Sequence, residues 1–167
     1  MLVDTYFKDP TSADLEKYGH LCVWNTGSVE NMANVFRDNL WKNGEWDVRL
    51  WDTRSVTIMD RAFAANTTGQ FNGVEHWDTI NVKSMLSMFY QAQSFNKDIG
   101  KWNTGNVENM MGMFYNALLF NQDISKWDTR KVKHKSDIFD GATALMDEYK
   151  PVFMHLAPSQ KATIVGK

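Results

Sequence analysis

The residues of this chain that could carry out chemistry do not form a known catalytic motif. The histidines, His20, His76, His134 and His155, stand in unrelated sequence contexts, and none forms the H-E-x-x-H pattern of a zinc protease. The single cysteine, Cys22, excludes an intramolecular disulfide and a paired-cysteine metal site. The chain has neither a G-x-S-x-G nucleophile motif nor a phosphate-binding glycine loop. The sequence therefore predicts a protein that is not an enzyme and that needs no cofactor or metal.

Basic side chains gather near the end of the chain and form the clearest candidate binding site. Residues 126–167 hold 8 basic and 5 acidic residues, whereas residues 1–125 hold 10 basic and 15 acidic residues. Such a cluster can bind a phosphate, an acidic protein or an anionic membrane surface, and the alternative is an ordinary solvated surface. No nucleic-acid-binding motif accompanies it, so nucleic acid is not an expected partner. The cluster comprises Lys126, Arg130, Lys131, Lys133 and Lys135.

Tryptophan recurs in a fixed context along most of the chain. Five tryptophans lie at intervals of 27, 26, 25 and 25 residues, and each precedes Asn or Asp and then Thr. Val follows five residues after each Trp, Met eight residues after and Phe twelve residues after, except that Lys135 replaces Met in the fifth unit. This periodicity predicts a repeat protein whose units bury their apolar faces against one another. The predicted repeat core comprises Trp24, Trp51, Trp77, Trp102, Trp127, Val29, Val56, Val82, Val107, Val132, Met32, Met59, Met85, Met110, Phe36, Phe63, Phe89, Phe114 and Phe139.

Each unit has the pattern of a strand, a turn and a short helix. An aliphatic residue three positions before each Trp suits a brief strand. Asn or Asp followed by Thr is typical of a turn. Apolar residues five, eight, eleven and twelve positions after the Trp match one face of a short helix. The sequence thus predicts an α/β solenoid, a stack of about five ~25-residue strand–turn–short-helix repeats with helical N- and C-terminal caps.

Length and composition are those of one globular domain. The chain has 167 residues, with 43% hydrophobic and 23% charged residues, and it has no apolar run long enough to cross a membrane. We expect one repeat domain over residues 1–167, with an N-terminal helical cap at 1–20 and five repeats at 21–139. A C-terminal helical cap is expected at 140–157 and a tail at 158–167.

The tryptophans admit a second interpretation. A column of indole rings is a stacking platform for sugars when the rings are exposed, whereas core packing is the simpler expectation for a residue at a constant repeat position. Trp41 and Trp46 lie outside the repeat, in the longest interval between repeat tryptophans. Exposed aromatic residues are common at protein interfaces, so both are candidate partner-binding residues.

The repeat unit resembles the BspA-like leucine-rich-repeat family, in the branch found in mycoplasma-type surface lipoproteins. The resemblance rests on the pattern Trp-Asp/Asn-Thr-x-x-Val-x-x-Met-x-x-Met-Phe, of which Met110 to Ile124 continue the best copy, and it covers roughly residues 14–140. It implies a solenoid related to leucine-rich repeats and a role in adhesion or protein binding. It implies no catalytic residues.

Together these observations predict a non-enzymatic repeat protein that is an interaction scaffold or a structural subunit of a larger assembly. The alternatives are a cell-surface adhesion module and a carbohydrate-binding protein that uses the tryptophan ladder. No signal peptide is visible at the start of the sequence, which favours an intracellular location. A surface location is the alternative if the chain is a processed fragment.

Overall fold

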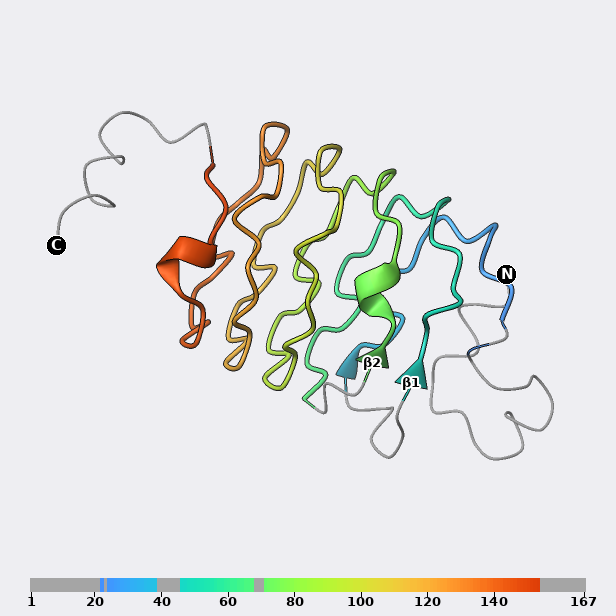
Figure 1. Cartoon of the computed structure of the whole chain (residues 1–167), viewed down its shortest axis with the longest axis horizontal. Helices are drawn as coiled ribbons and strands as arrows, with labels where there is room; N and C mark the ends of the chain where they lie inside the picture. The colour runs from blue at the N-terminus through green and yellow to red at the C-terminus, as the bar shows by residue number, and fades with distance from the viewer. Residues whose placement is uncertain (1–21, 23, 39–45, 68–70, 154–167) are drawn as a thin grey trace, which may run out of the picture.

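The repeats lie side by side along the long axis of the molecule, from the N-terminal to the C-terminal end (Figure 1). The computed structural model describes residues 22, 24–38, 46–67 and 71–153. Each repeat contributes one turn of chain, and the turns are stacked so that residues at the same repeat position are neighbours. The repeat period read from the tryptophans is therefore the period of the structure.

Backbone hydrogen bonds join each repeat to the next. A continuous series of parallel bridges connects equivalent residues of the five repeats, Asn31, Ile58, Ser84, Asn109 and His134. From this register onward, alternate N–H groups of one repeat donate to carbonyl oxygens of the following repeat over N–O distances of 2.6 to 2.9 Å. Because these bonds run between repeats, the backbone N–H and C=O groups of each repeat find their hydrogen-bond partners in the adjacent repeats.

Regular secondary structure is short within the described residues. Strand β1 (Trp46–Asp47) pairs in parallel with strand β2 (Phe71–Asn72), with Trp46 opposite Phe71. A 3-10 helix, η3 (Val74–His76), follows β2 directly, and a second, η4 (Asp147–Tyr149), lies in the last described segment. Of the strands expected to lead into each tryptophan, the described residues form only β1 and β2, which end four residues before Trp51 and five residues before Trp77.

The short helix expected in every repeat is also wrong. Two residues of each repeat, ten and fourteen positions after the tryptophan, have positive φ angles between 53° and 73°. A right-handed helix cannot pass through left-handed residues at this spacing, so the chain makes successive tight turns whose N–H groups point to the next repeat. These residues are Asn34, Arg61, Ser87, Gly112 and Asp137, then Asp38, Ala65, Gln91, Asn116 and Gly141.

The α/β solenoid with helical caps is therefore corrected to a stack of turns without α-helices in the described residues. The expected N-terminal cap at 1–20 lies outside the described part of the chain. In the described part of the expected C-terminal cap, 140–153, the only helix is the three-residue η4. Pro151 is buried there, beside the last repeat.

The core between the turns is a set of aromatic columns. Ring centroids of successive repeat tryptophans are 6.2 to 6.5 Å apart with interplanar angles of 3° to 9°. The repeat phenylalanines form a second column at 5.2 to 5.9 Å. A third set, Phe71, Phe95 and Phe120, packs on the second and is fully enclosed. Each ring therefore contributes both apolar burial and stacking to the adjacent repeat.

Candidate functional site

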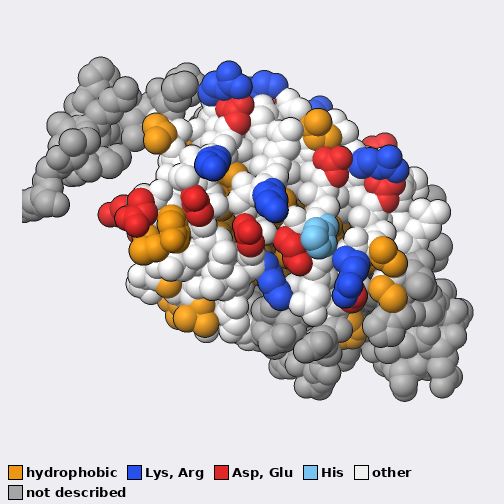
Figure 2. Space-filling model, in the orientation of Figure 1, with side chains coloured by type: hydrophobic (Ala, Val, Ile, Leu, Met, Phe, Trp, Pro, Cys, Tyr) orange, Lys and Arg blue, Asp and Glu red, His pale blue; other side chains and the backbone are white. Residues whose placement is uncertain are grey.

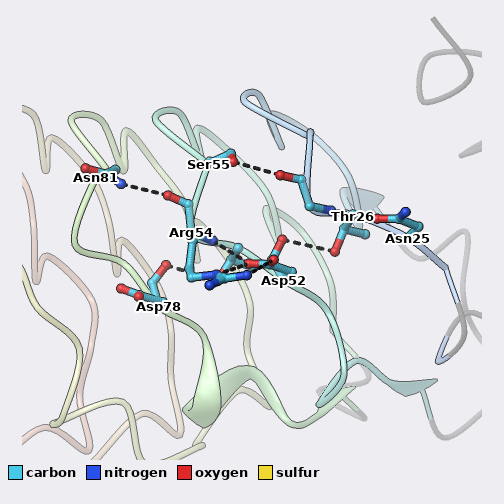
Figure 3. A network of polar contacts seen from close by, with 9 residues as sticks. Asn25, Thr26, Asp52, Arg54, Ser55, Asp78 and Asn81 are labelled. Carbon is cyan, nitrogen blue, oxygen red and sulfur yellow. Dashed lines mark hydrogen bonds and ion pairs between the residues drawn. The ribbon is translucent and has the colours of Figure 1, made fainter.

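A polar network fixes the turn that follows each tryptophan. The Thr26 hydroxyl donates to the backbone oxygen of Asp52 at 3.1 Å, and each later repeat threonine makes the equivalent bond to the segment that follows it. The Asp52 carboxylate accepts hydrogen bonds from the backbone N–H and the guanidinium of Arg54 (Figure 3). The Ser55 hydroxyl and the Asn81 amide donate to backbone carbonyls of the preceding repeat. Side-chain hydrogen bonds therefore connect adjacent repeats in addition to the backbone hydrogen bonds.

The repeat tryptophans are core residues rather than an exposed platform. Trp51, Trp77, Trp102 and Trp127 are at most 6% exposed, and Trp24 in the first repeat is half-buried. The indole N–H of Trp102 donates to the Val74 carbonyl at 3.0 Å, and the two neighbouring tryptophans make equivalent bonds. Faces that are stacked and buried in this way are not available to a sugar ring.

The remaining predicted core residues follow the same order. Four of the five valines, the four methionines and four of the five phenylalanines are buried, while Val29 and Phe139, in the first and last repeats, are half-buried. Trp46 is half-buried in β1 and packs against the core. Trp41 lies outside the described residues.

Four of the five predicted basic residues surround one pocket in the last repeat. The pocket has a volume of about 600 Å³ and is lined by Glu108, Arg130, Lys131, Val132, Lys133 and Lys135. Lys126 is exposed and does not line it. Lys131 and Lys133 are exposed on either side of the buried Val132, whereas Lys135 stands at the repeat position where the other repeats bury a methionine.

The pocket also contains an acidic residue that the sequence did not point to. Glu108 occupies the same repeat position as Lys133, six residues after the tryptophan, and their side chains form an ion pair at 2.6 Å. Aligning the two repeats at this position would have revealed the pair. The Lys131 ammonium donates to the Asn106 side-chain oxygen at 2.6 Å in the same way, between equivalent positions of neighbouring repeats.

Lys135 is the unusual member of the pocket. It replaces the buried methionine of the other repeats, and its ammonium lies 5.5 Å from the centre of the Phe153 ring. This ammonium nitrogen is buried and has no hydrogen-bond partner among the described residues. An ammonium removed from water is costly unless a carboxylate or another acceptor meets it, so an anionic ligand would be favoured here.

The Asp128–Arg130 pair gives a pH-dependent prediction. Side-chain and backbone hydrogen bonds from Arg130 lower the pKa of the Asp128 carboxyl from 3.8 to about 2. Because the folded pKa is the lower one, the stabilising contribution is complete above about pH 3.8 and is lost as the pH falls through about 2. We expect an NMR titration of Asp128 to give a midpoint near 2 and Arg130→Gln to raise it towards 3.8. An unchanged midpoint in the variant would contradict this cause of the shift.

The described residues contain neither a candidate metal site nor a candidate membrane-spanning helix. They contain no group of three or more His, Cys, Asp or Glu side chains that could hold a metal ion. Within the same residues, no helix is long and apolar enough to span a membrane. On the face drawn in Figure 2, acidic and basic side chains are interspersed, so the surface there has no single charge.

A stack of turns with aromatic columns inside and a basic pocket at its last repeat defines a repeat protein. The chain belongs to the family described as Mycoplasma protein of unknown function, DUF285, whose model matches residues 7–72 and 40–152. No curated protein and no solved structure matches the chain.

Proposed function

We propose that this chain is a non-enzymatic repeat protein that binds another protein, as an interaction scaffold or a structural subunit of a larger assembly. The observation that carries the proposal is the pocket lined by Arg130, Lys131, Lys133 and Lys135. The resemblance of the repeats to the BspA-like family also supports protein binding.

The charge of the pocket favours an acidic partner. Arg130 forms an ion pair with Asp128 at 2.6 Å, and Lys133 forms one with Glu108, so part of the positive charge is already balanced. Lys131 donates to a neutral side-chain oxygen and the Lys135 ammonium has no hydrogen-bond partner among the described residues, so neither lysine is hydrogen-bonded to a carboxylate there. Complementary charge steers association and makes it dependent on salt.

The direct test is to tag the chain in its native source, purify it gently at low salt and measure the mass of what accompanies it. We expect a stoichiometric complex that dissociates as the ionic strength rises. With the Lys131→Glu/Lys133→Glu double variant, the amount of co-purified partner should fall roughly tenfold or more. The new glutamates would face an acidic partner, and such like charges cost on the order of several kcal/mol.

The matched control is Lys101→Glu/Lys126→Glu. It changes the net charge by the same amount at two exposed lysines outside the pocket, and it should retain the partner. Equal loss in both double variants would show that net charge rather than the pocket governs binding. A chain that purifies alone at low salt would contradict the proposal.

A further inference from the structure

The same set of backbone hydrogen bonds joins each repeat to the one that follows it, and the last repeat has no following repeat among the described residues. In the fourth repeat, the N–H groups of Met110, Gly112, Phe114 and Asn116 donate to four alternate carbonyl oxygens of the fifth repeat at 2.7 to 2.9 Å. The carbonyl of Glu108 accepts a bond in return, from the N–H of the fifth repeat's equivalent residue at 2.8 Å. Five backbone groups of each interior repeat are therefore satisfied by the repeat that follows.

The equivalent five groups of the last repeat have no such neighbour. Among the described residues, nothing accepts a hydrogen bond from the N–H groups of Lys135, Asp137, Phe139 and Gly141, and nothing donates to the carbonyl of Lys133. Asp137 and Gly141 are left-handed, with φ angles of 57° and 73°, like their counterparts in the interior repeats. The edge thus has the conformation that receives another segment, and such an open backbone edge is a template for one.

A complete further repeat does not fit on this edge. The Thr129 hydroxyl donates to the Val152 carbonyl at 2.6 Å, as Thr104 does to the Asp128 carbonyl in the repeat before. Residues 151–152 therefore already occupy the place of the next repeat's tryptophan and its following residue. Along residues 133–141 no described backbone group takes the place of the next repeat, and the contacts there are those of the Phe153 ring with Lys135 and of the Lys150 ammonium with Phe139.

Charge identifies the kind of segment that would add along residues 133–141. The edge begins within the basic pocket, beside Lys131, Lys133 and the buried Lys135 ammonium. The chain's own residues 154–167 contain two lysines and no acidic residue, so they do not complement it. An incoming segment in register would place its residue equivalent to Glu108 against Lys133, and a carboxylate there would repeat the Glu108–Lys133 contact.

We propose that the open edge of the last repeat binds an extended, acidic segment of a partner protein, which adds in parallel alongside residues 133–141. The segment supplies alternate carbonyl oxygens to the four N–H groups and a carboxylate to the lysines. This inference rests on the proposed protein-binding function, and it specifies how the partner binds.

The chain's first repeat provides a probe with the required pattern. A synthetic peptide of residues 28–38 has the repeat spacing, carries Glu30 at the position that would face Lys133, and carries Arg37 at the position that would face Asp140. Fluorescence anisotropy with the full chain at low salt should show saturable binding. Changing Glu30→Lys in the peptide should weaken binding at least tenfold, and Met32→Glu should strengthen it severalfold because it brings a carboxylate to Lys135.

A charge exchange locates the contact. Lys133→Glu in the protein should abolish binding of the unmodified peptide and restore binding of the Glu30→Lys peptide, while Lys126→Glu should leave both affinities unchanged. Hydrogen exchange of the Lys135, Asp137, Phe139 and Gly141 amides should slow at least tenfold when the peptide saturates the protein, because their N–H groups acquire acceptors.

Each contrary result has a distinct meaning. Peptide binding without protection of the four amides would show contact through charge alone and would overturn addition to the edge. Absence of binding up to about 1 mM peptide at low salt would overturn it as well. If the peptide result is negative but the native complex forms with the unmodified chain and is lost in the Lys131→Glu/Lys133→Glu variant, the proposed function stands. Only this mode of binding is then overturned.

Discussion

Phe114→Ala is expected to lower the free energy of unfolding by about 3–5 kcal/mol, the usual range for truncating a fully buried phenylalanine. The Phe114 ring is completely enclosed and packs between the rings of Phe89 and Phe139. Its centroid lies 4.1 Å from the centroid of the Phe120 ring. Removing it leaves a cavity that the rigid columns on either side cannot fill. Urea denaturation followed by tryptophan fluorescence measures the loss.

The end of the column provides the comparison. Phe139 is half-buried and has a ring partner in only one adjacent described repeat, so Phe139→Ala should cost clearly less than Phe114→Ala. Leu119→Ala is the surface control, because Leu119 is 58% exposed, and it should change stability by no more than about 0.5 kcal/mol. Equal losses at positions 114 and 139 would contradict the order of the repeats.

Gly73→Ala should be destabilising by at least about 2 kcal/mol, because overpacking and backbone strain each contribute about 1–3 kcal/mol at such a position. Gly73 has a φ of 100° and connects β2 to η3. A Cβ atom there would collide with the backbone N and Cα of Arg49, which belong to the turn after β1 and cannot rotate away like a side chain. The substitution should therefore push the segment after β2 away from the segment after β1 and weaken the pairing of the two strands.

Gly27→Ala is the matched control for Gly73→Ala. A Cβ atom at Gly27 would meet its nearest neighbour, the Asp52 carboxylate oxygen, at 3.4 Å, which is an ordinary contact. Its effect on the free energy of unfolding should stay within about 0.5 kcal/mol. A Gly73→Ala variant as stable as the Gly27→Ala variant would contradict the close approach of the two segments.

The register of this fold could be predicted from the sequence, but its backbone could not. Constant spacing of Trp, Val, Met and Phe is enough to align repeats, and the structure stacks residues with the same spacing. The same spacing fits a helical face and a series of tight turns equally well. The two backbones differ in the residues with positive φ angles. Ser and Ala rarely adopt positive φ, so Ser87 and Ala65 gave no sign of this conformation in the sequence.

The candidate site could be predicted in part for a related reason. A run of lysines and an arginine was visible in the sequence, yet only the structure shows that Lys126 stands apart from the pocket. Glu108 was missed because it lies a full repeat earlier in the chain and joins Lys133 only when the turns stack. The unmatched N–H groups of the last repeat depend on the same stacking, and no residue type marks them.

The bonds between repeats also bear on how such a chain changes during evolution. Since every interior repeat gives its neighbour the same four amides and receives the same contacts in return, a whole unit can be duplicated or lost while the junctions on either side keep their form. An insertion between the tryptophan and the phenylalanine of a unit has no such freedom, because it would break the alignment with both adjacent units. The loop after the phenylalanine does vary, since the first two intervals are two residues and one residue longer than the last two and their tryptophans still stack. Family members are therefore expected to differ in length by whole units, and their terminal residues to diverge more than their interior ones.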